Sequence, residues 1–327
     1  MPMSKRPKHY DVFNGDADGI CALLQLRLNT PKNSRLITGV KRDIQLLHQV
    51  AEQQDVGSVT VLDISMEKNQ SALRSLLQRK VDVFYCDHHR TGPVPISPHL
   101  KSLLDNSSEI CTSLFINLYL NNYYYMWACV GAFGDNLYEP ATALALEHDV
   151  AQEDIDFLKQ LGTLINYNGY GGSIEDLHFH PKALFESLLK YPNPLRLRDK
   201  TDGVFHKLKS GFDRDWDNVR SIQATSSTQH IEIYKLPSQA WARRISGTYG
   251  NWLANENPNK AIAVLTANPC GESYTVSVRS PLTNRKGADY VCSQFPTGGG
   301  RLAAAGINAL PEDMVALFIE KMEERFG

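Results

Sequence analysis

Short apolar runs alternate with amphipathic stretches along the first third of the chain. The apolar runs lie at 9–13, 35–40, 58–64 and 81–86, and β-branched and aromatic residues favour strands there. The stretches between them repeat their apolar positions at helical spacing. Nearly continuous apolar strands separated by helices are typical of a parallel sheet that is covered on both faces. The pattern therefore predicts an α/β fold.

The pattern changes twice further along the chain. From Ser113 the apolar positions follow helical spacing, and a tract rich in Pro, Asn and charged residues follows at about 190–220. Strand-like runs and helical stretches then return. We predict a larger N-terminal domain with the parallel sheet, a linker and a smaller C-terminal α/β domain, at 1–190, 191–225 and 226–327.

The composition is that of a soluble globular protein, with 42% hydrophobic and 21% charged residues among 327. A formal net charge of −2 argues against coating of long nucleic acid. The six cysteines form no CxxC pair, which indicates reduced thiols. Neither a secretory signal nor an apolar run of the ~18 residues that a membrane span needs is evident. We expect a cytoplasmic protein without a membrane partner, and its oligomeric state stays open.

Acids and imidazoles follow the predicted strands at their carboxyl ends. They are Asp16 and Asp18, Asp63, and the triplet Asp87, His88 and His89. Because the carboxyl ends of parallel strands share one edge of a sheet, we expect these side chains to converge. Gathered carboxylates repel one another unless a cation neutralises them. Asp with His and without thiolate is a ligand set for Mn²⁺ or Mg²⁺.

A further acid, Asp135 in AFGDN, follows another apolar stretch, where Gly131 and Gly134 would permit close approach to the site. Each acid alone has an ordinary explanation. DADG is often a turn or a fragment of a calcium loop, and Asp63 could cap a helix. Their succession, each after an apolar segment, is more specific and predicts a metal site.

The four motifs NGDADG, VLDIS, YCDHHRTG and AFGDN resemble, in this order, those of the DHH phosphoesterase family. That family includes RecJ-like single-strand exonucleases, oligoribonucleotidases that also act on adenosine bisphosphate, cyclic-dinucleotide phosphodiesterases and family-II inorganic pyrophosphatases. The C-terminal segments 276–280 and 287–307 resemble the DHH-associated substrate-binding domain. The resemblance spans nearly the whole chain.

The resemblance implies a pair of Mn²⁺ ions, or Mg²⁺, that activate a water molecule for attack on phosphorus. The implied metal ligands are Asp16, Asp18, Asp63, His88 and Asp135, with Asp63 as the bridge and a catalytic residue. His89 would contact the phosphate or protonate the leaving oxygen. Asp87 would hydrogen-bond a neighbouring imidazole and fix its orientation.

The resemblance also implies phosphate-binding residues. Arg90 and Arg279 suit this role because a guanidinium matches phosphate oxygens bidentately. We expect Gly298, Gly299 and Gly300 to form a loop that approaches an anion closely, followed by a helix over LAAAGINAL whose N-terminus faces it. Arg301 stands where the family usually has His, and its guanidinium can still bind phosphate. We expect the active site in the cleft between the domains.

A second departure concerns the first metal ion. Val12 stands where several branches of the family have a His ligand, four residues before Asp16, so the first ion would be weakly held or would use Asn14 or water instead. This resembles the exonuclease branch more than the pyrophosphatase branch. We expect a phosphoesterase that acts on short oligonucleotides or nucleotides. The alternatives are a single-strand exonuclease, a cyclic-dinucleotide phosphodiesterase and a non-catalytic DHH protein that binds nucleic acid.

Overall fold

The computed structural model describes residues 7–107 and 109–327, which divide into two compact units. The first unit comprises the chain up to Gly169 together with Leu177–Lys209, and the second comprises Tyr170–Asp176 and Ser210–Gly327. Helix α9 (Val204–Val219) occupies much of the tract in which a linker is predicted, and the division falls within this helix.

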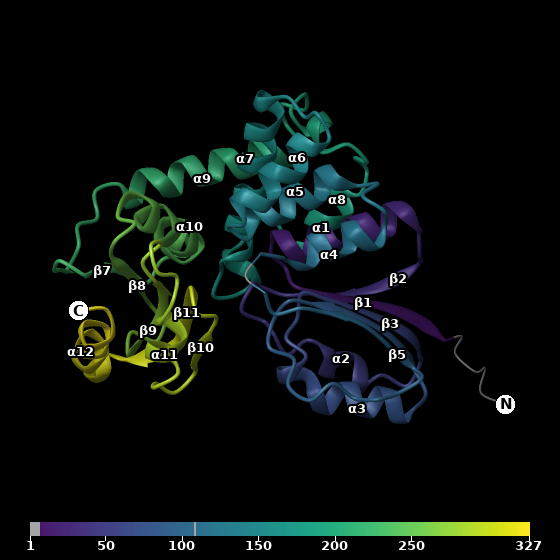
Figure 1. Ribbon diagram of the computed structural model, residues 1–327, viewed down its shortest axis with the longest axis horizontal. Helices are drawn as coiled ribbons and strands as arrows, with labels where there is room; N and C mark the ends of the chain where they lie inside the picture. The colour runs from purple at the N-terminus through teal and green to yellow at the C-terminus, as the bar shows by residue number, and fades with distance from the viewer. Residues whose placement is uncertain (1–6, 108) are drawn as a thin grey trace. The chain divides into compact units, whose positions relative to one another are not determined.

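A five-stranded parallel sheet forms the centre of the first unit (Figure 1). Its order is β2-β1-β3-β4-β5, and every neighbouring pair is parallel. The strands are β1 (Lys8–Phe13), β2 (Ser34–Ile37), β3 (Val56–Leu62), β4 (Asp82–Asp87) and β5 (Leu100–Leu104). This sheet confirms the predicted α/β fold. The pattern does not predict β5, because Lys101 and Ser102 interrupt its apolar residues.

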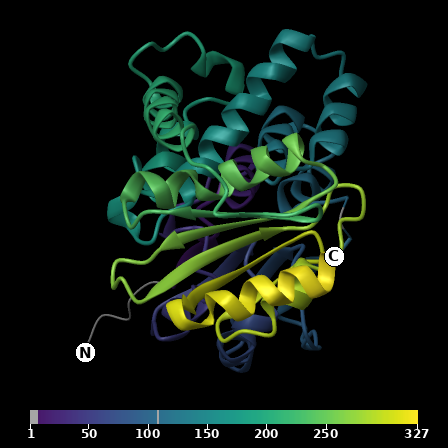
Figure 2. The ribbon, with the colours of Figure 1, turned by 90° about the vertical axis from the view of Figure 1, so that its left-hand side faces the viewer.

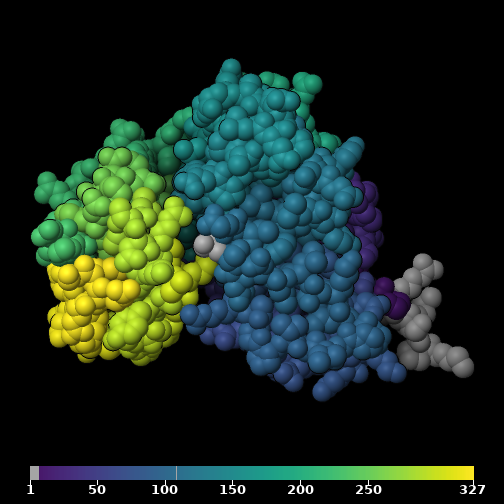
Figure 3. All heavy atoms as spheres, in the orientation of Figure 1, coloured from purple at the N-terminus to yellow at the C-terminus, as the bar shows by residue number. Residues whose placement is uncertain are grey.

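Helices cover both faces of this sheet (Figure 1). On one face, α2 and α3 pack on a core that includes Val12, Val61 and Tyr85. The other face carries α1, α4, α5, α7 and α8. Most of the blue and teal atoms in Figure 3 belong to this first unit. The helices are α1 (Ala17–Asn29), α2 (Leu47–Ala51), α3 (Gln70–Gln78), α4 (Thr112–Tyr119), α5 (Tyr125–Gly134), α6 (Tyr138–Glu147), α7 (Gln152–Gly169) and α8 (Pro181–Leu188).

The helical stretch predicted at 114–136 is two helices. Helix α4 ends at Tyr119, and Asn121 and Asn122 adopt left-handed backbone conformations, with φ of 55° and 61°. Asparagine tolerates this region better than most residues, so these two residues can form the turn that separates the helices. Helix α5 then begins at Tyr125. No helix in the described part of the chain combines the length and hydropathy that a membrane crossing needs.

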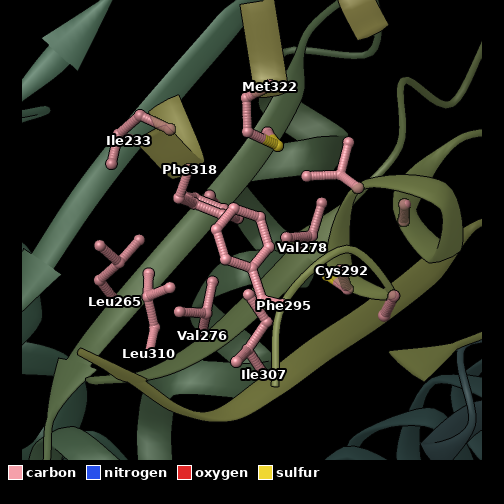
Figure 4. Packing of buried hydrophobic residues seen from close by; sticks show 14 of the residues in the cluster. Ile233, Leu265, Val276, Val278, Cys292, Phe295, Ile307, Leu310, Phe318 and Met322 are labelled. Carbon is pink, nitrogen blue, oxygen red and sulfur yellow. The ribbon is translucent and has the colours of Figure 1, made fainter. Parts of the chain in front are cut away.

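The second unit contains a six-stranded mixed sheet of order β10-β11-β9-β8-β7-β6. Helix α12 covers one of its faces and α10 the other (Figure 2). The core under α12 includes Ile233, Val276, Ile307 and Phe318 (Figure 4). The elements are β6 (Ser226–Ser227), β7 (Ile231–Leu236), α10 (Ala240–Glu256), β8 (Ala261–Ala267), β9 (Ser273–Arg279), α11 (Ala288–Cys292), β10 (Gly298–Gly300), β11 (Ala304–Pro311) and α12 (Val315–Phe326).

The glycine motif is an edge strand, and the expected helix after it is absent from residues 302–310. Gly298–Gly300 form β10, which pairs antiparallel with β11. Ala305 and Ile307 alternate with more exposed neighbours and enter the core, which is the period of a strand. The prediction of a helix N-terminus facing an anion at this motif is therefore wrong, because the small residues of LAAAGINAL pack as a strand.

Candidate metal centre

The loops after β1, β3 and β4 bring most of the predicted ligands to one edge of the first sheet. Asp63 directly follows β3, and Asp87 is the last residue of β4. Asp16 and Asp18 stand at the beginning of α1, after β1. The common direction of the strands explains why residues far apart in the sequence meet here, as expected for an open parallel sheet.

Asp63 lies at the centre of this group with a left-handed backbone conformation. Its φ is 57°, in a region that glycine, asparagine and aspartate adopt more readily than other residues. Non-glycine residues in this region are found often at functional sites. The alternative that Asp63 caps a helix is wrong, since Met66 and Asn69 precede the next helical segments.

His88 is a buried imidazole with one nitrogen aimed at the acids. Its Nδ1 lies 3.0 Å from the carbonyl oxygen of Ile110. A carbonyl only accepts, so Nδ1 carries a proton and Nε2 is the nitrogen that faces the acids. Nε2 lies 3.3 Å from Asp63 Oδ1, 3.7 Å from Asp18 Oδ2 and 3.8 Å from Asp135 Oδ2. An imidazole oriented by a backbone carbonyl, with its other nitrogen among carboxylates, is the arrangement of a metal ligand.

Asp18 is held by the N-terminus of α4. The backbone N–H of Thr112 donates to Oδ2 at 2.8 Å, and that of Ser113 donates to Oδ1 at 2.7 Å. These donors are among the amides that a helix leaves unpaired at its start, and the helix dipole favours a carboxylate there. Both oxygens are thereby oriented, and each keeps a lone pair for a cation.

Asp135 caps the C-terminus of α5 and completes the group around His88. The two preceding glycines allow this approach, as expected. A methyl group at Gly134 would overlap the side chain of Ala17, and one at Gly131 would overlap that of Ser113. Helix α5 therefore packs closely on α1 and α4, which brings its C-terminal acid to the edge of the sheet.

His89 and Asp87 form a pair beside the acids. His89 Nδ1 lies 2.7 Å from Asp87 Oδ1, as the sequence predicts for a neighbouring imidazole. Burial opposes ionisation of Asp87, but the charge and hydrogen bond of His89 outweigh it and lower the pKa of Asp87. The His89 side chain is 31% exposed while Asp87 is buried. Nε2 of His89 can therefore meet a substrate while Nδ1 remains fixed.

Asp16 has two hydrogen-bond partners, a backbone amide and a lysine. One oxygen accepts from the N–H of Gly19 at 3.1 Å and caps α1, so the ordinary role of a cap applies here. The other accepts from Lys41 Nζ at 2.5 Å. Sequence reasoning missed Lys41, although it directly follows the strand predicted at 35–40. The rule that located the acids, a polar residue after a parallel strand, would have found it.

The acids repel one another enough to favour a bound cation. Burial first, and then the charges of Asp16 and Asp18, raise the pKa of Asp63 well above its ordinary range. For Asp16, burial acts in the same direction, but the charge of Lys41 prevails and lowers its pKa. Ligand atoms of Asp63, His88 and His89 all lie within 4.8 Å of one another. Oxygen and imidazole donors in this number fit Mn²⁺ or Mg²⁺.

Arg90 follows the triplet on an exposed loop. Its carbonyl oxygen accepts from Ser65 Oγ at 3.1 Å and from the N–H of Glu67 at 3.3 Å. The loop is thereby tied to the segment after Asp63. Its backbone is fixed beside the acids, and phosphate binding by its side chain stays a prediction.

The other predicted phosphate ligands belong to the second unit. Arg279 is the last residue of β9, where its Nε donates to Asn251 Oδ1 at 2.6 Å. It pairs in register with Ala304, at the start of β11. Arg301 lies in the turn between β10 and β11, next to Gly300. Two guanidinium-bearing residues and the glycine strand thus share one end of this sheet.

No protein-family model and no curated protein matches the sequence. Solved structures of similar fold do exist. An exonuclease RecJ bound to manganese superposes with a TM-score of 0.61 at 16% identity, over 97% of this chain and 89% of that one. RecJ of Thermus thermophilus, in complex with Mn²⁺, gives 0.62 at 16% identity. The match covers 97% of this chain but only 51% of the Thermus protein.

A third similar structure is PggH of Vibrio cholerae, a pGpG-specific phosphodiesterase. It gives a TM-score of 0.53 at 10% identity, over 95% of this chain and 98% of that one. RecJ and PggH are members of the DHH family. The chain therefore has the fold of the DHH phosphoesterases, which confirms at the level of fold the resemblance that its motifs indicate.

Proposed function

We propose that this protein is a metal-dependent phosphoesterase that hydrolyses short oligonucleotides or nucleotides. The observation that carries the proposal is the orientation of His88, with Nε2 held among Asp18, Asp63 and Asp135. The names of the similar structures, an exonuclease and a phosphodiesterase, support a phosphoester as the reacting group.

Asp18, Asp63, His88 and Asp135 would hold a divalent cation, and Mn²⁺ is the first candidate because the similar RecJ structures contain it. When bound, such an ion polarises a phosphoryl group and lowers the pKa of a coordinated water. Asp63, between His88 and His89, supplies the central carboxylate. Asp16, the remaining ligand that the resemblance implies, is hydrogen-bonded to Lys41.

His89 acts on the substrate side of the centre. With Nδ1 bonded to Asp87, Nε2 of this partly exposed side chain can, in the imidazolium form, donate a hydrogen bond to a phosphate oxygen or a proton to the leaving oxygen. Asp87 holds the ring in this orientation. Arg90, Arg279, Arg301 and the backbone of Gly298–Gly300 are the proposed phosphate contacts.

A near-neutral chain favours a short substrate over a long polyanion. The similarity to RecJ keeps a single-strand exonuclease as the second candidate. The test is an assay of the full chain with Mn²⁺ on a labelled dinucleotide, a longer single strand, a cyclic dinucleotide, adenosine bisphosphate and pyrophosphate.

We expect fastest turnover of the dinucleotide or the bisphosphate. Preference for the longer strand would favour the exonuclease instead. A matched His89→Gln variant should lose turnover with each substrate that the wild type hydrolyses. Absence of turnover with all five substrates would refute the enzyme and favour a nucleic-acid-binding protein.

A further inference from the structure

Lys41 is the one cationic side chain that the described contacts place inside the carboxylate group. Its Nζ donates to Asp16 Oδ2 at 2.5 Å and to Asn166 Oδ1 at 3.1 Å. Asp135 Oδ1 lies 3.9 Å from the same nitrogen. The ammonium group thus stands between two acids that the family resemblance assigns to metal ions.

The backbone of Lys41 is fixed as firmly as its side chain. Its N–H donates to the carbonyl oxygen of Gly169 at 2.8 Å, and its own carbonyl accepts from Asn14 Nδ2 at 3.2 Å. Gly169 ends α7 so close to the loop after β1 that a methyl group there would lie 3.2 Å from Asp16 Cα. Asn166, which accepts from Nζ, is a buried residue of the same helix. Lys41 is therefore held both by Asn14, in the loop that leads to Asp16, and by the end of α7.

The ligands that the first metal ion would need are engaged elsewhere. Val12 is fully buried and packs in the core under α2 and α3, on the other face of the sheet. Asn14 uses its amide nitrogen for Lys41 and its amide oxygen for the N–H of Asp16, at 3.2 Å. Neither residue replaces the missing imidazole. The Lys41 side of the group thus consists of Asp16, one oxygen of Asp135 and an ammonium.

The His88 side has a different composition. It contains Nε2 of His88, Asp18, Asp63 and the second oxygen of Asp135. Asp135 faces both sides, with Oδ1 toward Lys41 and Oδ2 toward His88. The carboxylates therefore divide into a part that contacts the ammonium group of Lys41 and a part that surrounds Nε2 of His88.

We propose that the ammonium group of Lys41 takes the place of the first metal ion, so that the centre binds a single divalent cation on the His88 side. Lys41 supplies the positive charge that the first ion would otherwise bring to Asp16 and Asp135. The inference rests on the proposed function, because it concerns the same site, but metal content tests it without any substrate.

The experiment titrates the metal-free full chain with Mn²⁺, and measures bound metal by equilibrium dialysis and the electron paramagnetic resonance of the bound ions. We expect one Mn²⁺ per chain with the spectrum of an isolated ion. Lys41→Ala should bind two ions with the spectrum of a spin-coupled pair, because Asp16 is released. Lys41→Arg, which keeps the charge, should bind one.

Asp16→Asn provides a second measurement that does not depend on the stability of Lys41 variants, since asparagine also caps helices well. It should still bind one Mn²⁺, because Asp16 holds the lysine and not the ion. Two ions per wild-type chain, or one ion in Lys41→Ala, would overturn the inference and leave the proposed function standing. A wild type that binds no Mn²⁺ would refute both.

Discussion

The first sheet contains a buried acid within a strand, Asp11, and a group of buried acids at its edge, the candidate metal centre. The negative charge is balanced differently at these two places. Asp11, within β1, accepts from Nε and Nη2 of Arg27, at 2.8 and 2.5 Å, and from Ser34 Oγ at 2.5 Å. His9 Nε2 lies 3.0 Å away. Burial opposes ionisation, but Arg27 prevails and lowers the pKa of Asp11 to about 2. Both oxygens of this acid have partners that the fold itself provides.

The candidate metal centre lacks this balance. Its acids share Lys41, and the pKa of Asp63 is raised rather than lowered. A cavity of about 790 Å³ is lined in part by Arg27 and Ser34, two of the partners of Asp11. We nevertheless favour the other group as the functional site, because an acid with a strongly raised pKa beside further carboxylates is a candidate for function, whereas Asp11 is paired with an arginine of the fold.

Replacement of Asp11 should break the balanced group with the largest effect on stability. Asp11→Asn leaves the buried guanidinium of Arg27 without a counter-charge, which costs about 3–5 kcal/mol of the free energy of unfolding. Urea denaturation measures this loss, and the turnover of the folded fraction should be unchanged. Asp217→Asn is the control, because its pair with Arg220 is exposed and worth about 1 kcal/mol or less. Equal losses in the two variants would contradict the contrast.

Asp63→Asn should give the opposite result. Turnover should fall by at least about 100-fold, the upper end of what loss of an outer-sphere partner costs a metal site, which equals about 2.7 kcal/mol. Metal-free stability should stay at or above that of the wild type, since the change removes repulsion and asparagine accepts the positive φ. A variant with wild-type turnover would exclude Asp63 as a ligand.

Acid should remove the contribution of Asp11 selectively. Its folded pKa of about 2 lies below the ordinary value of 3.8, so the stabilisation is complete above the ordinary value and is lost as the pH falls through the folded one. The shift corresponds to about 2 kcal/mol. The difference in unfolding free energy between wild type and Asp11→Asn should shrink by this amount between pH 6 and pH 2. A constant difference would show that Arg27 does not hold the carboxylate.

The strand ends of the first sheet were predictable because periodicity and turn chemistry are local properties. Asp63 and His88 follow apolar runs, and the parallel arrangement then brings them together. The partners that orient them were not predictable in this way. Asp18 is bound by the start of α4 and His88 by the carbonyl of Ile110, and both contacts depend on where distant backbone amides and carbonyls come to lie.

At the glycine motif, local sequence did not predict even the secondary structure. Its small residues suit a helix and a strand equally well, and pairing with β9 decides the outcome. Lys41 was overlooked for a different reason, because a lysine after a strand is usually a solvated side chain. Only the positions of Asn166 and Gly169 at the end of α7 reveal that it turns inward.

Asp87 resembles Asp11 in its pairing and the acids of the metal centre in its position. Its replacement should give the smallest of the expected changes. Like Asp11 it has a lowered pKa, but its partner is the partly exposed His89, and its Oδ2 is buried without a hydrogen-bond partner in the described structure. Asp87→Asn keeps the shape and removes the charge that orients the imidazole. We expect kcat to fall about tenfold with KM unchanged, the lower end of the loss seen for partners of this kind.

A double-mutant cycle separates this positioning role from a purely structural one. If Asp87 acts through His89, the effects on kcat are not additive, and Asp87→Asn should change kcat little further in a His89→Gln background. Additive losses, or a loss confined to urea stability, would place Asp87 with Asp11 among the acids that serve the fold. Non-additive losses would place it with Asp63, because its charge would then be felt only through the imidazole that faces the substrate.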